Sequence, residues 1–310
     1  MPKKIDRREF IQQSAAISVS SILGKNLGSN IKLQAQNIDM AVVKGENYFK
    51  SAKIAVETLG GMKKFVSENS KVALLPNVQS RHPGTYTKPE IVRAAIQMCK
   101  DAGAKEIDCI GWLPGRNWIN TGMKEVIDGE GAKLVITNER DESLFKPVPI
   151  PKGEVLKEAR IMKTFYDYDV FINMNIIKEH SGSNLSGALK NLMGINSPKS
   201  NLNFHKRKGT TNKDDIRHLD RCIADLNTII QPDLCIIDAT EFVITNGPHG
   251  PGELLKPQKV IASTDPVAID SYGATLFGYN PKDILVLVKA HQHGIGEMDI
   301  GKLNIKELVI

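Results

Sequence analysis

The chain has 310 residues, of which 41% are apolar and 25% are charged, as expected for a globular protein with one large core or two lobes. Its formal charge of +6 arises mainly in residues 1–35, which hold six basic and two acidic residues and leave 35 basic against 33 acidic residues elsewhere. This near-neutral body argues against a nucleic-acid-binding protein, which needs a concentrated basic surface.

The cysteines show no Cys-x-x-Cys spacing, so we expect no ferredoxin-type iron–sulfur cluster. Two of the four lie in apolar runs that look like strands and one lies on a helix pattern, which favours buried structural thiols, although the sequence does not exclude a disulfide. They are Cys99, Cys109, Cys222 and Cys235.

The N-terminus resembles a twin-arginine export signal. Arg7 and Arg8 precede Phe10-Ile11 and a weakly apolar stretch that ends near Leu23. The stretch is too short and too rich in Ser and Gln for a stable membrane anchor. We therefore predict a signal over 1–35, recognition by the twin-arginine translocase and a periplasmic location. The alternative is an amphipathic N-terminal helix in a cytoplasmic protein.

Beyond residue 35, short apolar runs alternate with amphipathic helix patterns. This alternation predicts right-handed βαβ units in a single α/β domain over 36–310, with a mainly parallel twisted sheet and helices on both faces. Strands are expected at 40–43, 71–77, 106–111, 133–137, 170–172, 233–239 and 259–262. Helices are expected at 47–59, 87–102 with Thr87 as cap, 117–128, 154–165, 185–193, 213–230 and after the cap Asp265. Residues 78–87, 140–153, 196–212 and 245–252 are expected to be loops.

The segment 169–194 organises the chain. A short buried strand at 170–172 is followed by polar residues, a Gly/Ser loop at 181–184 and a helix that ends at Gly194. In an open α/β sheet such a junction lies at the carboxyl end of a strand, where ligands bind. We therefore expect the site at the carboxyl ends of the strands.

The residue types in this segment favour an anion. Free N–H groups at a helix N-terminus attract negative charge, and Gly182 and Gly187 allow close backbone approach. Ser186 and Lys190 are four residues apart and would share a helix face, while His180 could bind a metal or move a proton. The alternative interpretation is a capped helix with a solvated Lys190 and an ordinary loop histidine.

These residues also resemble a known family. Lys178-Glu179-His180 and the run 186–194 are similar to the bacterial and archaeal family called domain of unknown function 362, as are 247–250, 262–270 and 294–296. The family has no agreed activity, so the resemblance implies a fold and not a reaction.

A more distant resemblance is to the lactate racemase family, which uses a nickel-pincer nucleotide. It implies that Lys190 carries the cofactor, that His205 binds nickel, and that Arg81 lies near the substrate. His180 matches the histidine before the Gly-rich turn; with Lys190 and Arg81 it is a candidate catalytic residue, and with His205 a candidate metal ligand. Gly182, Ser186 and Gly187 would form the cofactor-binding loop. Residues 112–116 contain no counterpart of that family's second catalytic histidine, so we expect no lactate racemisation.

Two functions remain open from the sequence. The first is an enzyme that acts on a small anionic substrate with a metal or bound cofactor, in a cleft built from Arg81, His82, His180, Lys190, His205 and His249. The second is a binding protein that captures an anionic ligand without turnover. Asp270, His291 and His293 are further candidates to face the cleft, whereas His218 reads as an ordinary surface histidine.

Overall fold

The computed structural model describes residues 38–205 and 213–310. The predicted export signal at 1–35 lies outside these residues, so export and periplasmic location stay predictions. Within the described ranges, no helix combines the length and apolar character needed to cross a bilayer.

An eight-stranded mixed sheet forms the centre of the fold. Its strands are β1 (Met40–Lys44), β2 (Lys71–Pro76), β3 (Glu106–Gly111), β4 (Lys133–Ile136), β7 (Val170–Met174), β10 (Leu234–Ala239), β13 (Lys259–Ser263) and β14 (Ile305–Val309). Their order is β14-β1-β13-β10-β7-β2-β3-β4. Five neighbouring pairs are parallel, and only β13 runs antiparallel to both its neighbours. The prediction of a mainly parallel sheet is confirmed.

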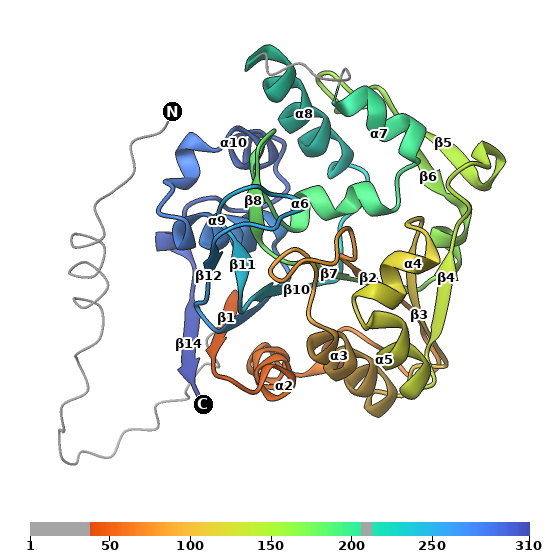
Figure 1. Cartoon of the computed structure of the whole chain (residues 1–310), viewed down its shortest axis with the longest axis vertical. Coiled ribbons are helices and arrows are strands. Elements are labelled where there is room, and N and C mark those ends of the chain that lie inside the picture. Colours follow the sequence, from red (N-terminus) through yellow and green to blue (C-terminus); the bar gives the residue numbers. More distant parts are fainter. Residues whose placement is uncertain (1–37, 206–212) are drawn as a thin grey trace, which may run out of the picture.

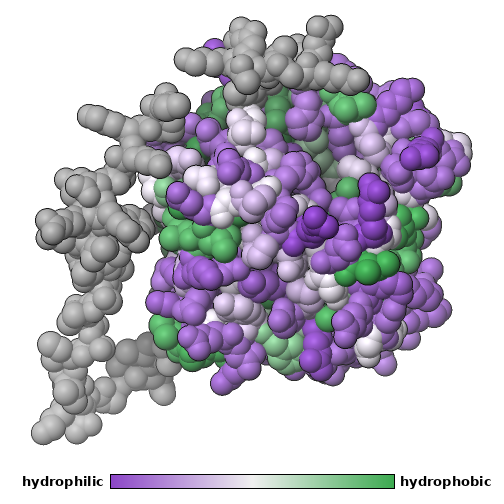
Figure 2. Space-filling view, in the orientation of Figure 1, coloured by the Kyte–Doolittle hydropathy of each residue, from purple (hydrophilic) through white to green (hydrophobic). Residues whose placement is uncertain are grey.

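Helices cover both faces of this sheet (Figure 1). One face packs on α2 (Tyr48–Thr58), α3 (Pro89–Asp101), α4 (Gly115–Asn120) and α5 (Met123–Gly129). The other packs on α6 (Ala188–Asn191), α8 (Lys213–Leu226), α9 (Pro266–Leu276) and α10 (Leu285–Gln292), and α7 (Pro198–Phe204) lies beside α8. Side chains of each strand alternate between the two cores, as Val42 and Val43 illustrate. With the apolar residues buried in this way, the face in Figure 2 is mostly hydrophilic.

Three antiparallel hairpins and several 3₁₀ turns complete the described structure. The hairpins pair β5 (Phe145–Pro149) with β6 (Glu158–Met162), β8 (Lys178–His180) with β9 (Asn184–Ser186), and β11 (Phe242–Val243) with β12 (Leu254–Leu255). The 3₁₀ turns are η1 (Met62–Lys64), η2 (Glu142–Leu144), η3 (Lys163–Asp167), η4 (Leu192–Gly194), η5 (Pro281–Asp283) and η6 (Ile300–Lys302).

Some predicted elements were wrong. Residues 140–153 and 154–165, expected to be a loop and a helix, contain β5 and β6. The prolines of β5 are tolerated because the hairpin is an edge ribbon, and in β6 Ala159 and Ile161 alternate toward the core. The predicted helix at 117–128 is divided by Gly122, whose φ of 70° is left-handed. The predicted loop at 196–212 begins with α7.

Helix caps were predicted with mixed success. Asp265 caps α9 as expected, since its Oδ1 accepts from the backbone N–H groups of Val267 and Ala268 at 2.8 Å each. Thr87 does not cap α3, where Lys88 holds the cap position. The Thr87 hydroxyl instead donates to the Met174 carbonyl at 2.8 Å and so ties the loop after β2 to β7.

Candidate functional site

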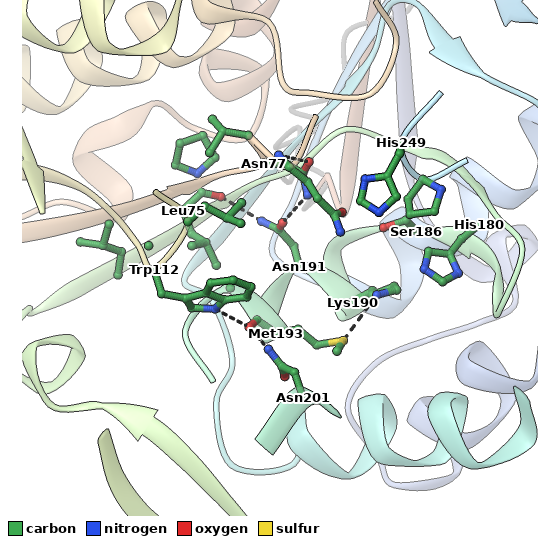
Figure 3. Close-up of a pocket in the computed structure, with 18 of the residues that line it drawn as sticks. Leu75, Asn77, Trp112, His180, Ser186, Lys190, Asn191, Met193, Asn201 and His249 are labelled. Carbon is green, nitrogen blue, oxygen red and sulfur yellow. Dashed lines mark hydrogen bonds between the residues drawn. The ribbon is translucent and has the colours of Figure 1, made fainter. Parts of the chain in front are cut away.

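A cavity of about 430 Å³ opens at the carboxyl ends of β2 and β3 (Figure 3). The segments that follow these strands, α4, the β8–β9 hairpin, α6, η4, α7 and the loop at 248–249 also contribute to its wall. Parallel strands end at the same edge of a sheet, and this edge is where the sequence placed the site.

Several of the predicted site residues meet at this cavity. His180, Ser186, Lys190, His205 and His249 line it, although they are spread over 70 residues of sequence. Figure 3 shows Lys190, His180 and His249 on the same side of the space. The described residues that line the cavity do not include Arg81, His82, Gly182 or Gly187.

The predicted helix at 185–193 was wrong in its first part. Residues 184–186 form β9 and pair with β8, so Gly182 belongs to a hairpin turn and α6 begins only at Ala188. Asn184 adopts a left-handed φ of 60°, which suits the tight turn. The apolar spacing of 185–193 resembled a helix, but cross-strand pairing decided the local structure.

The N-terminus of α6 is occupied by a carboxylate of the protein itself. Asp270 on α9 accepts from the backbone N–H groups of Ala188 at 2.6 Å and Leu189 at 2.9 Å. Burial raises the pKa of Asp270 to about 7, although these two hydrogen bonds favour its charged form. The expectation of free N–H groups for an external anion was therefore wrong, and the expectation that Asp270 faces the cleft was wrong as well.

A buried amide network holds α6 against the strand ends. Asn191 donates to the Leu75 carbonyl at 2.9 Å and accepts from Asn77 Nδ2 at 3.1 Å (Figure 3). It also donates to Asn173 Oδ1 at 2.8 Å. Asn173 in turn donates to the Ala188 carbonyl at 2.9 Å. The network positions Lys190, the neighbour of Asn191, relative to β2 and β7.

We expect Asn191→Leu to lower the free energy of unfolding by about 2–4 kcal/mol, because it leaves several buried polar groups without partners. Urea denaturation measures the change. Asn120→Leu, at an exposed position on α4, is the matched control and should change stability by less than about 0.5 kcal/mol. Equal stability of the two variants would show that the network contributes little.

Lys190 is a cation without a carboxylate in contact. Its Nζ lies 3.5 Å from the Met193 sulfur, and it forms no ion pair with any described residue. Burial lowers the pKa of Lys190 to about 8, opposed by the more distant charge of Asp220. Burial also raises the pKa of Asp220 to about 7, opposed by Lys190. Lys190 is therefore available to pair with a charge that enters the cavity.

A second lysine lies behind the wall. Lys178 is fully buried and donates to the Thr85 carbonyl at 2.6 Å and to Asn77 Oδ1 at 3.1 Å. Burial, and then the charge of Lys190, lower the pKa of Lys178 to about 7. Because its donors are directed to internal oxygens, Lys178 adds positive potential to the cavity without reaching into it.

His180 and His205 present opposite hydrogen-bonding roles. The Gly182 N–H donates to His180 Nδ1 at 3.0 Å, so the ring proton of neutral His180 is on Nε2. His205 Nδ1 lies 2.9 Å from the Asn201 carbonyl and must donate to it, which leaves a lone pair on Nε2. Burial, and then Lys190, lower the pKa of His180 to about 2, and burial lowers that of His205. The site thus contains one imidazole donor and one imidazole acceptor.

The same hydrogen bonds bear on metal binding. His205 has the arrangement typical of a metal-binding histidine, with Nδ1–H on a carbonyl and a free Nε2, whereas His180 carries its proton on the outer nitrogen. In the described part of the chain, no group of three or more His, Cys, Asp or Glu residues could hold a metal ion. Metal binding at this site stays a prediction.

The remaining predicted residues lie elsewhere. Arg81 is exposed, His291 Nδ1 contacts the Gly296 carbonyl at 2.8 Å, and His293 Nε2 contacts Asp225 Oδ1 at 2.9 Å. None of the three lines the cavity. The cysteines are all free and buried.

Sequence reasoning missed part of the site. Trp112 and Trp118 line the cavity, and they follow β3 where the racemase resemblance had called for a histidine. Two polar positions were also missed, the buried Lys178 and the network residue Asn191. A signal was present for Trp112, because it comes directly after a strand whose end faces the site.

Comparisons with known proteins identify a family and leave the reaction open. The chain is 26% identical to the Thylakoid-associated protein sll1697 of Synechocystis sp. over 84% of this chain and 80% of that protein. The lactate racemase apoprotein of Thermoanaerobacterium thermosaccharolyticum is similar in structure, with 15% identity and a TM-score of 0.46. That similarity covers 76% of this chain and a little over half, 56%, of the racemase chain. The model of the family described as Domain of unknown function (DUF362) matches residues 72–275, so the chain belongs to that family.

Proposed function

We propose that this chain is an enzyme that acts on a small organic anion bound in the cavity. The main support for this proposal is the charge of the cavity wall. Lys190 and three histidines line the cavity, and none of its described lining residues is Asp or Glu. A wall of this kind attracts anions and repels cations. Ionisable groups with strongly shifted pKa values in one cavity are typical of catalytic sites.

The hydrogen-bonding roles suggest how such an enzyme would work. The Lys190 ammonium and the Nε2–H of His180 would hold the anionic group of the substrate. His205 Nε2 would accept a proton from another position of the substrate and so act as the general base. Lys190 and His205 are also the residues that would hold a nickel-pincer-like cofactor, which would supply Lewis-acid chemistry that these side chains lack. Arg81 is exposed and outside the cavity wall, so we give it no role in holding the substrate.

A non-catalytic anion-binding protein would present the same wall. The two functions differ in the fate of the ligand, so mass spectrometry of a bound organic anion after long incubation distinguishes them. Conversion that depends on His205 supports the enzyme, and an unchanged ligand supports the binding protein. The protein should be purified from its native host so that any resident cofactor is retained.

The pH dependence of binding tests the role of Lys190. Its folded pKa of about 8 lies below the usual value of a lysine, so raising the pH through 8 removes its charge while a carboxylate ligand stays ionised. We expect the affinity for benzoate to fall about 30-fold between pH 7 and pH 9.5, as measured by calorimetry. Asp220→Asn should move the midpoint to lower pH, because Asp220 supports the charged form of Lys190.

Lys190→Arg is the matched control, because arginine stays charged over this range. Its affinity should be nearly constant from pH 7 to pH 9.5. A wild-type profile as flat as that of Lys190→Arg would exclude Lys190 as the anion-binding cation.

A further inference from the structure

The cavity has two walls of different chemistry. Figure 3 shows Trp112 and Leu75 on one side and His180, His249 and Lys190 on the other. Ile110, Leu113 and Trp118 extend the apolar wall along the end of β3 and into α4. A ligand that fills this space therefore has one charged end and one apolar end.

The apolar wall presents aromatic surface to a ligand, but its indole N–H groups are already hydrogen-bonded within the protein. The Trp112 Nε1–H donates to the Met193 carbonyl and the Trp118 Nε1–H to the Leu113 carbonyl, both at 3.0 Å. A Cβ on Gly111 would lie 3.0 Å from Trp118 Cζ2, so this glycine allows the ring to pack closely on β3. Fixed indoles whose N–H groups are already used favour flat apolar partners.

The size of the cavity excludes a minimal anion as a good fit. A volume of about 430 Å³ would hold on the order of ten waters, at about 30 Å³ for each. Acetate or phosphate would leave most of that water, and the whole apolar wall, in place. A ring system would displace the water from the wall and gain from burial.

The polar wall selects the charged group. Lys190 is the single Lys or Arg among the described lining residues, and none of those residues is Asp or Glu. Phosphate sites usually combine several cations with the unpaired N–H groups of a helix N-terminus. Here Asp270 already accepts from the N–H groups at the N-terminus of α6. A single lysine cation in the wall matches a single negative charge on the ligand.

We infer that the ligand is a monocarboxylate carried on a flat apolar ring, that is, an aromatic or cyclic carboxylic acid. Its carboxylate pairs with Lys190 and its ring lies against Trp112, behind which Trp118 is buried. This assignment rests on the proposed anion-binding function and names the chemical class of the ligand.

A ligand series on the wild-type protein tests the class. Calorimetry should give affinities in the order 2-naphthoate, benzoate, acetate, with at least a 100-fold span. Phenyl phosphate should bind more weakly than benzoate, and the neutral 2-naphthalenemethanol at least 10-fold more weakly than 2-naphthoate. Because the chain has only two tryptophans and both line the cavity, quenching of tryptophan fluorescence by the ligands reports binding at this site.

A tryptophan variant separates the contribution of the ligand's ring to affinity from that of its carboxylate. Trp112→Leu should lower the affinity for 2-naphthoate at least 10-fold and leave that for acetate within 2-fold. Acetate binding within 3-fold of 2-naphthoate in the wild type, or tighter binding of phenyl phosphate than of benzoate, would overturn the assignment while anion binding stands. Failure of every anion to bind, or equal binding by wild type and Lys190→Met, would overturn the proposed function itself.

Discussion

Lys190→Met should weaken the binding of benzoate about 100-fold, or roughly 2.7 kcal/mol, and leave the fold intact. Methionine preserves most of the side-chain volume and removes the charge that faces the cavity. Lys190 makes no ion pair with a described residue, and its one short polar contact is with the Met193 sulfur at 3.5 Å. The substitution therefore removes no strong internal interaction, and the free energy of unfolding should change by less than about 1 kcal/mol.

Calorimetry at pH 7 measures the binding, and urea denaturation measures the stability. Lys282→Met is the matched control, because Lys282 is exposed in η5 and does not line the cavity. The control should bind benzoate as the wild type does. Wild-type affinity in Lys190→Met would remove the basis for an anion site at this lysine.

Gly187→Ala should destabilise the protein by about 3 kcal/mol or more. A Cβ at this position would lie 2.2 Å from Asp270 Oδ1 and 2.5 Å from its Oδ2. Asp270 is buried on α9 and cannot move away without losing its hydrogen bonds to Ala188 and Leu189. The substitution therefore affects the cap that holds α6, and thermal or urea denaturation measures the loss.

A double-mutant cycle with Asp270→Ala tests this cause. Asp270→Ala alone should cost about 3 kcal/mol, because it leaves two buried N–H groups unpaired. In that background Gly187→Ala should cost less than about 1 kcal/mol, since the clashing carboxylate is gone. Additive effects of the two substitutions would mean that the cost of Gly187→Ala has another source.

The sequence predicted the elements that depend on local pattern. Continuous apolar runs marked β2, β3, β7 and β10, and Asp265-Pro266 marked the start of α9, because buried strands and helix caps have signatures within a few residues. The motif at Lys178–His180 and 186–194 was sufficient for the family assignment, which the match over 72–275 confirmed. His180 and Lys190 belong to that motif, and His205 was predicted from the more distant racemase resemblance; all three line the cavity.

Contacts between distant residues decided the rest. The β8–β9 hairpin replaced a helix because residues 178–180 pair with 184–186, and the β5–β6 hairpin replaced another for the same reason. Asp270, 82 residues away from Ala188, closed the helix N-terminus that the local pattern had left open to an anion.

The character of the cavity also came from tertiary structure. Chain order alone could not show that Trp112 lies opposite His180, or that Lys190 makes no ion pair with a described residue, because burial and charge pairing depend on which strand ends meet. The sequence by itself thus determined the fold class, the family and several of the residues that line the cavity, among them His180 and Lys190. Tertiary structure decided which of those residues share a cavity, which groups carry charge there, and what kind of ligand surface lies opposite them.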